Sequence, residues 1–305
     1  MKVLVTGAYG FLGGYVLAEL MNRSIDTTSP PRDLLDLLKP DDLYDWYNWT
    51  EADSIIHLAA RCGGIGANQA NPASFFHDNL QMGINVLEVA RMCRPDKVVL
   101  VGTVCSYPKH CPAPFKETDL WNGYPEETNA PYGIAKKALL VMLQAYRQQY
   151  GLNGIYLMPA NLYGPGDNFD PETSHVIPAM IRKLAEAKRK RDKEVTFWGT
   201  GRPTREFLHA RDAARGIVDA LLTYNDPEPV NLGTGIEVGI WSLAETVAGI
   251  LGYRGAIKWD PAKPDGQPRR VLDTARAHES FGFAARIPLY DGLRETVEWW
   301  SKQPS

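Results

Sequence analysis

The chain has 305 residues, of which 44% are hydrophobic and 23% charged, and its 33 basic and 36 acidic residues leave a formal net charge of −3. This composition is typical of an ordinary globular protein that is long enough for two domains. The one basic run, 188–193, is too short to indicate nucleic-acid or membrane binding, and no apolar run approaches the ~20 residues of a membrane span. Because the first residues also lack a signal-peptide core, we expect a cytoplasmic protein with four free cysteines.

Short runs rich in Val, Ile and Leu alternate with stretches whose apolar residues recur at helical spacing. This alternation predicts βαβ units around a parallel sheet, and hence an α/β protein with a Rossmann-type doubly wound sheet. The strand-like runs are 2–7, 54–60, 96–103 and 154–164, and the two clearest helical stretches are 76–93 and 132–151.

After residue 169 the chain changes to shorter elements punctuated by Pro and Gly, which predicts a smaller α/β C-terminal domain. A strand-plus-helix pattern from 207 and a further strand ending near 232 predict that the chain returns to the first domain in between. We therefore expect interleaved domains, with 1–161 and 207–232 forming the first and 162–206 and 233–305 forming the second.

A glycine-rich loop follows the first strand. Gly7, Gly10 and Gly13 have the spacing G-x-x-G-x-x-G between this strand and a predicted helix. Such a loop needs residues without a Cβ, because a pyrophosphate must approach the backbone at the helix N-terminus. The second strand, 24–28, ends without the acidic residue that usually holds the ribose of NAD, and Arg32 follows it. This pattern favours NADP(H) over NAD, with an exposed surface arginine as the alternative for Arg32.

Tyr132 and Lys136 are four residues apart at the start of a predicted helix and so share one face. We expect the ammonium to bring the pKa of the tyrosine closer to neutrality. Thr103 ends the preceding strand. Together with the glycine loop, these residues predict the reduction of a carbonyl whose oxygen contacts Thr103 and Tyr132.

Several longer segments resemble the extended short-chain dehydrogenase/reductase superfamily and, within it, the GDP-L-fucose synthase family. The resemblance implies NADPH-dependent 3,5-epimerisation and 4-reduction of GDP-4-keto-6-deoxy-D-mannose. It implies that the first of the two interleaved domains, 1–161 and 207–232, binds NADP and that the second, 162–206 and 233–305, binds the nucleotide sugar. It also implies a homodimer built on the two long helices near Asn85 and Val141. The segments that carry it are "GGIGANQANPASF", "VCSYPK", "APYGIAK", "NLYGPGDNFDPETSHVIPAMIRK", "FWGTGRPTREFLH", "NLGTG" and "KPDGQPRRVLD".

The resemblance gives Cys105 and His175 the roles of base and acid in epimerisation. Carbons 3 and 5 of a 4-keto sugar both carry protons alpha to the ketone, so one base and one acid on opposite faces of the ring suffice. A packed thiol and a loop histidine are the structural alternatives. A 4,6-dehydratase is disfavoured because Val104 and Cys105 stand where that class has an Asp-Glu pair. A reductase without epimerase activity and a dinucleotide-binding sensor without turnover stay open.

The resemblance also implies the ligand contacts. Two positions depart from the family pattern: Thr103 stands where serine is common, and Tyr9 stands where an arginine helps to hold the 2′-phosphate. The implied cofactor contacts are Gly7, Tyr9, Gly10, Phe11, Leu12, Gly13, Arg32, Leu58, Ala59, Ala60, Thr103, Tyr132, Lys136, Ala160, Asn161, Leu162 and His175. The implied substrate contacts are Asn161, Lys183, Trp198, Arg205, Asp265 and Arg270.

Overall fold

A computed structural model describes residues 1–263 and 265–303 of the chain. Its centre is a six-stranded sheet in the order β10-β5-β4-β3-β1-β2, in which every neighbouring pair is parallel. The predicted Rossmann-type α/β fold is therefore confirmed. The strands are β1 (Lys2–Thr6), β2 (Asp26–Thr28), β3 (Ser54–His57), β4 (Lys97–Val101), β5 (Gly154–Pro159) and β10 (Val230–Leu232).

The strand order reverses between β1 and β3. From β1 the chain passes outward to β2 on one side, and it then crosses to β3 on the other side. In an open parallel sheet, ligands bind in the crevice outside the carboxyl ends of the strands at such a reversal. The loops that follow β1, β3 and β4 therefore surround the expected site.

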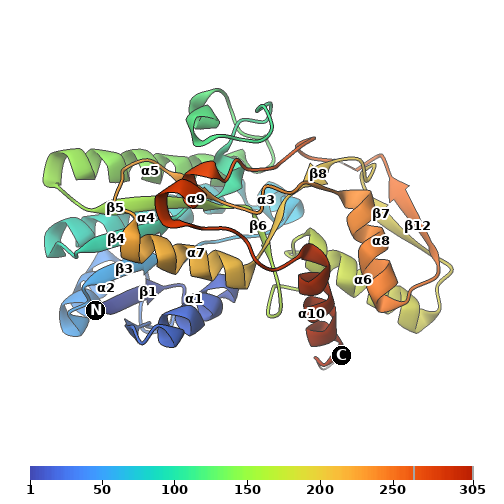
Figure 1. Cartoon of the computed structure of the whole chain (residues 1–305), viewed down its shortest axis with the longest axis horizontal. Coiled ribbons are helices and arrows are strands. Elements are labelled where there is room, and N and C mark those ends of the chain that lie inside the picture. The colour runs from blue at the N-terminus through green and yellow to red at the C-terminus, as the bar shows by residue number, and fades with distance from the viewer. Residues whose placement is uncertain (264, 304–305) are drawn as a thin grey trace.

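Helices cover both faces of this sheet (Figure 1). α1 (Phe11–Asn22) packs against α7 (Ala210–Thr223), and α4 (Pro72–Cys93) packs against α5 (Ala130–Tyr150) and α2 (Pro40–Thr50). β4 is buried along its whole length, as expected for a strand that is covered on both faces. α5 begins with Pro131 in its first turn and ends at Gly151 in the left-handed conformation, which are common start and stop signals.

A smaller lobe lies beside this domain (Figure 1). It contains a two-stranded parallel sheet of β7 and β12 with helices α6, α8 and α10, while two short strand pairs, β6 with β9 and β8 with β11, lie nearby. The bounds are β6 (Asn161–Tyr163), α6 (Val176–Lys190), β7 (Glu194–Trp198), β8 (Thr204–Arg205), β9 (Phe207–His209), β11 (Val238–Gly239), α8 (Ile240–Leu251), β12 (Ala256–Asp260) and α10 (Leu289–Ser301). The remaining helices are α3 (Ile65–Ala70), η1 (Val104–Ser106), η2 (Glu117–Trp121) and α9 (Ala275–Phe281).

Two hydrophobic cores correspond to the two lobes. The larger surrounds the six-stranded sheet and includes α7 and β10, whereas the smaller joins α6, α8 and α10. Three residues from the segment 233–305 belong to the larger core, namely Leu272, Ala277 and Phe283. The exact domain boundaries stay a prediction.

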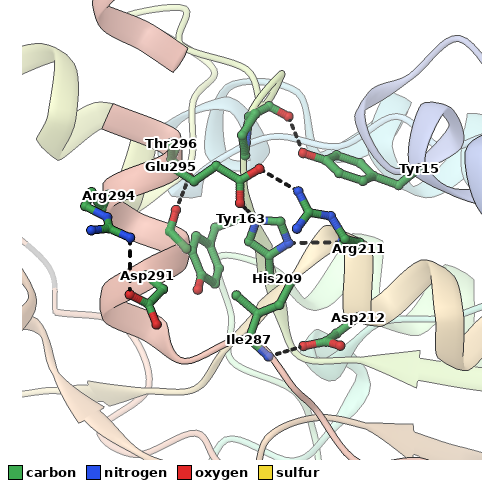
Figure 2. Close-up of polar contacts among 12 residues, drawn as sticks. Tyr15, Tyr163, His209, Arg211, Asp212, Ile287, Asp291, Arg294, Glu295 and Thr296 are labelled. Carbon is green, nitrogen blue, oxygen red and sulfur yellow. Dashed lines mark hydrogen bonds and ion pairs between the residues drawn. The ribbon is translucent and has the colours of Figure 1, made fainter. Parts of the chain in front are cut away.

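The lobes meet around a buried histidine at the end of β9 (Figure 2). The His209 ring is edge-on to Tyr163, at 5.3 Å, and to Tyr15 of α1, at 6.0 Å. Its Nδ1 accepts a hydrogen bond from the Arg211 backbone at 3.2 Å, and its Nε2 lies 3.8 Å from Glu295 of α10. Glu295 in turn pairs with the Arg211 side chain. The junction therefore links α1, which follows the glycine loop, to the last helix.

All four cysteines are free. Within residues 1–263 and 265–303, no helix combines the length and the apolar character needed to cross a membrane.

Candidate active site

The glycine-rich loop joins β1 to α1 where three backbone segments come close together. Gly7 has φ +74°, and a Cβ there would lie 2.5 Å from the backbone nitrogen of Ala59. A Cβ on Gly13 would lie 2.2 Å from the carbonyl oxygen of Gly7. Only glycine fits at either position, and the tight turn directs the N-terminus of α1 toward the crevice, as a dinucleotide pyrophosphate requires.

A cavity of about 400 Å³ lies beside this loop. Its lining includes Tyr9, Gly10 and Phe11 from the loop and Pro165 and Gly166 from the segment after β6. The glycine loop, the start of α1 and the segment after β6 therefore line this cavity together. The shape of the cradle and the free helix end fit a bound dinucleotide.

The other predicted cofactor contacts differ in their exposure and in the hydrogen bonds that they already make. Leu58, Ala59 and Ala60 directly follow β3 and are half-buried. Ala160 donates its N–H to Leu232 at 2.8 Å, and Leu162 lies in β6. Asn161 already donates its side-chain amide to the Glu206 carbonyl at 2.8 Å. Tyr9 and Arg32 are exposed, the latter in the segment after β2.

Tyr132 and Lys136 lie one turn apart on α5, but the structure differs from the expected electrostatics. The Lys136 ammonium is buried and donates to the Val101 carbonyl at 3.1 Å, while the Tyr132 hydroxyl lies 3.5 Å from the sulfur of Cys62. Burial, followed by the effects of Cys62 and Cys105, raises the pKa of Tyr132 well above its usual value. Burial also lowers the pKa of Lys136. The expected shift of the tyrosine toward neutrality is therefore wrong for this arrangement, because burial dominates.

Cys105 lies in η1, immediately beyond β4. Its backbone N–H is held by the Thr103 hydroxyl at 3.2 Å, and its sulfur accepts a hydrogen bond from the Arg270 guanidinium at 3.5 Å. Arg270 is only 7% exposed and donates through Nε to Gln267 at 3.0 Å. Gln267 is itself anchored to the carbonyls of Pro108 and Lys109. A buried, oriented cation therefore faces the thiol.

His175 precedes α6 and opens onto solvent. The surrounding protein desolvates its ring in part, and this desolvation, followed by the positive charge of Arg270, lowers the pKa of His175. Arg270 thus acts electrostatically on His175 while it contacts Cys105 directly. Arg270 is therefore a neighbour that the two predicted epimerisation residues share.

The predicted substrate residues form two groups. Arg205 donates to the Asp265 carbonyl at 3.3 Å, and burial, followed by the charge of Arg270, lowers the pKa of Arg205 to about 9. The Asp265 carboxylate receives hydrogen bonds from the Thr200 backbone and hydroxyl at 2.6 and 2.7 Å. Both carboxylate oxygens of Asp265 therefore already accept hydrogen bonds from Thr200, and they hold the segment around Thr200 in place.

The second group lies along α6 and β7. Lys183 donates to the carbonyl of Thr196 and lies 5.4 Å above the Phe197 ring. Trp198 is 59% exposed, and the Lys263 ammonium lies 5.4 Å above its ring. Among the predicted substrate residues, Arg270 contacts Cys105 and acts electrostatically on Arg205, whereas Lys183 and Trp198 belong to the smaller lobe.

The model of the NAD dependent epimerase/dehydratase family matches residues 3–233. This chain belongs to that family. Among curated relatives, it is 41% identical to "Probable GDP-L-fucose synthase 1" of Oryza sativa subsp. japonica, over 98% of this chain and 92% of the relative. Membership in the epimerase/dehydratase family agrees with the glycine loop and the parallel sheet.

Solved structures of two proteins share the whole fold of this epimerase/dehydratase. A GDP-6-OMe-4-keto-L-xylo-heptose reductase from C. jejuni superposes with a TM-score of 0.93 at 28% identity, covering 99% of this chain and 98% of that one. A GDP-L-fucose synthetase from Naegleria fowleri bound to NADP superposes with a TM-score of 0.89 at 26% identity, covering 99% and 94%.

Two residues of this epimerase/dehydratase site were missed from the sequence. Cys62 contacts the hydroxyl of Tyr132, and Gln267 orients Arg270. The position of Cys62 shortly after β3 was an available signal, since loops at the carboxyl end of such a strand reach the site. Gln267 carried no comparable signal, because its role depends on a contact with residues far away in the chain.

Proposed function

We propose that this chain converts GDP-4-keto-6-deoxy-D-mannose to GDP-L-fucose, by epimerisation at carbons 3 and 5 and NADPH-dependent reduction at carbon 4. The observation that carries the proposal is the contact of Cys105 with Arg270, together with the contact of Tyr132 with Cys62. Both occur in a chain that is similar along its length to GDP-L-fucose synthases. NADP(H) is proposed as the cofactor because the glycine cradle fits a dinucleotide and the N. fowleri neighbour was solved with NADP.

The reduction uses groups at the carboxyl end of β4 and the start of α5. When bound, NADPH supplies the hydride. Thr103 and Tyr132 hydrogen-bond the ketone oxygen, and Tyr132 gives its proton to the alkoxide as it forms. The high pKa of Tyr132 keeps this proton in place at neutral pH. Lys136, held at the Val101 carbonyl, supplies a nearby positive charge and can reach ribose hydroxyls.

The epimerisation uses Cys105 and His175 on the two faces of the sugar. Cys105 removes a proton alpha to the ketone, the Tyr132 and Thr103 hydroxyls stabilise the enolate oxygen, and His175 returns a proton from the other side. A guanidinium next to the sulfur neutralises the negative charge of a thiolate, which supports its use as the base. Arg205 and Arg270 also suit the diphosphate of the substrate, since one guanidinium group can donate two parallel hydrogen bonds to phosphate oxygens.

The test is incubation with GDP-4-keto-6-deoxymannose and NADPH in deuterated water, followed by NMR of the product. We expect GDP-L-fucose with deuterium at carbons 3 and 5. Cys105→Ser should abolish most of the label, whereas Cys93→Ser, at the far end of α4, should leave it unchanged. A lack of NADPH consumption with this sugar would contradict the proposal.

A second candidate is 4-reduction of a related GDP-4-keto sugar without epimerisation. It is favoured by the similarity to the C. jejuni heptose reductase, whose structure superposes with the TM-score of 0.93. The same experiment separates the two functions. A reduced product that keeps the manno configuration and contains no deuterium would support the reductase and exclude the epimerase.

We also propose a homodimer that works in the cytoplasm. Exposed apolar side chains on α4 and α5 support the association of these helices with a second copy, namely Phe76, Met92, Val141 and Tyr150. The four free thiols fit a reducing compartment. A monomeric mass at micromolar concentration would exclude the dimer.

A further inference from the structure

Cys62 is a thiol in the cleft that the proposed reaction does not use. Its sulfur lies 3.5 Å from the Tyr132 hydroxyl, and the residue is exposed to solvent. The Tyr132 ring is also packed edge-on against Phe75, with ring centroids 6.5 Å apart. The tyrosine is therefore supported at two points, by an aromatic ring along its side and by a sulfur at its hydroxyl.

The loop that carries Cys62 is fixed on its N-terminal side. The backbone of Arg61 donates to the Asn79 side chain at 3.0 Å, and the Asn79 amide returns a hydrogen bond to the Arg61 carbonyl at 3.0 Å. Asn79 is only 1% exposed and also donates to Phe75 at 2.7 Å. The hydrogen bonds of Asn79 therefore fix both the loop and the backbone of the aromatic residue that packs on Tyr132.

The C-terminal side of the loop is fixed as well. The buried Asn68 donates to the carbonyls of Gly63 and Gly64, at 2.8 and 3.0 Å. Gly64 donates its N–H to the Thr173 carbonyl at 3.1 Å. The loop that carries the sulfur is thus fixed on both sides of Cys62. Thr173 belongs to the segment that leads to His175.

Burial and the neighbouring groups shift the pKa values of both Cys62 and Tyr132. Cys62 faces Tyr132 and Lys136 of α5 and Cys105 of η1. Burial raises the pKa of Cys62, whereas the hydrogen bond from Tyr132 and the charge of Lys136 lower it. Tyr132 faces Cys62, Cys105 and Tyr156, and burial and both thiols raise its pKa. Burial thus keeps both groups protonated at neutral pH, and each of the two affects the proton of the other.

We propose that Cys62 is a positioning residue whose sulfur accepts the hydrogen bond of the Tyr132 hydroxyl and keeps that proton available for the sugar oxygen. This inference rests on the proposed function of Tyr132. During reduction the O–H bond of Tyr132 breaks, a new O–H bond forms on the sugar alkoxide, and the phenolate regains a proton from solvent. Cys62 keeps its own proton at neutral pH and forms no covalent bond in this step.

The first test needs no substrate. Alkylation of Cys62 by iodoacetamide is followed by peptide mass spectrometry across a range of pH in the wild type and in Tyr132→Phe. Loss of the hydroxyl should move the Cys62 profile about half a unit to one unit toward higher pH. Cys93 should keep its profile in both proteins, because burial alone raises its pKa. An unchanged or downward-shifted Cys62 profile would overturn the proposal.

The second test measures turnover of GDP-4-keto-6-deoxymannose. Cys62→Ala should lower kcat by about two- to tenfold with KM for the sugar nearly unchanged, and should move the basic limb of the pH profile to lower pH. Cys62→Ser should restore part of kcat, while Cys93→Ala should match the wild type. A basic limb that moves to higher pH would refute an acceptor role. If the wild type does not turn over this sugar, the proposed function fails, while the alkylation test still decides the role of Cys62.

Discussion

Gly7→Ala perturbs the glycine loop at its most constrained point. A Cβ there would lie 2.5 Å from the Ala59 nitrogen and 2.7 Å from its Cα, where real Cβ contacts essentially do not occur. The residue also has φ +74°, which costs an L-amino acid about 1–2 kcal/mol. Overpacking against a fixed backbone typically adds about 1–3 kcal/mol. We therefore expect a total loss of about 2–5 kcal/mol, shared between folding and the binding of NADPH.

Two assays separate these effects. Urea unfolding gives the loss in stability, and NADPH titration in the absence of urea should show an affinity at least tenfold weaker, since about 1.4 kcal/mol corresponds to a factor of ten. Gly249→Ala is the matched control, because Gly249 is exposed in α8 and a Cβ there meets nothing within 4 Å. That variant should be as stable as the wild type or up to about 1 kcal/mol more stable. If Gly7→Ala matched the wild type in both assays, the cradle would not be as tight as described.

Three further changes have defined outcomes. Burial raises the pKa of Asp167 to about 7 from 3.8, so protonation of this carboxyl favours the folded state. This contribution to stability is complete below about pH 4 and is lost as the pH rises through about 7. Asp167→Asn should therefore be more stable than the wild type at about pH 8, by up to about 4 kcal/mol. Thermal unfolding of both proteins at about pH 4 and about pH 8 measures this, and the same stability difference at the two pH values would contradict it. Glu206 is only 1% exposed and accepts from the backbone N–H groups of Thr234, Gly235 and the buried Leu272, so Glu206→Ala should lower the free energy of urea unfolding by about 3 kcal/mol; a loss below about 1 kcal/mol would be inconsistent with these contacts. Arg270→Met removes a positive charge beside His175 and should raise the pKa of its imidazole toward 6.5 in an NMR titration, whereas an unchanged value would show that Arg270 does not act on it.

The strand-loop-helix core could be predicted because each of its signals is local. The glycine spacing, the apolar runs and the return of the chain at β10 follow from short stretches of sequence, and the parallel sheet confirms them. The packing of Gly7 and Gly13 against neighbouring backbone supplies the physical reason for their spacing. The pairing of Cys105 with Arg270 is different in kind, because these residues are far apart in the chain and only the fold brings them together.

The electrostatics of the reductase pair could not be predicted from spacing. Four residues of separation placed Tyr132 and Lys136 on one face, but the direction of the lysine side chain depends on the Val101 carbonyl. The same limit applies to Asp265, whose carboxylate is engaged by Thr200. Charge and spacing indicate which groups can react, whereas burial and hydrogen-bond partners determine which of them are free to do so.

The central sheet is not formed by one continuous stretch of the chain. β5 gains its outer neighbour, β10, only after the polypeptide has passed through β6, α6 and β7 and returned along β9 and α7. A chain emerging from the ribosome therefore presents β5 as an unpaired edge until much of the smaller lobe has been synthesised. Fragments that end between β7 and β10 should aggregate, because an uncovered parallel edge offers its free N–H and C=O groups to other chains.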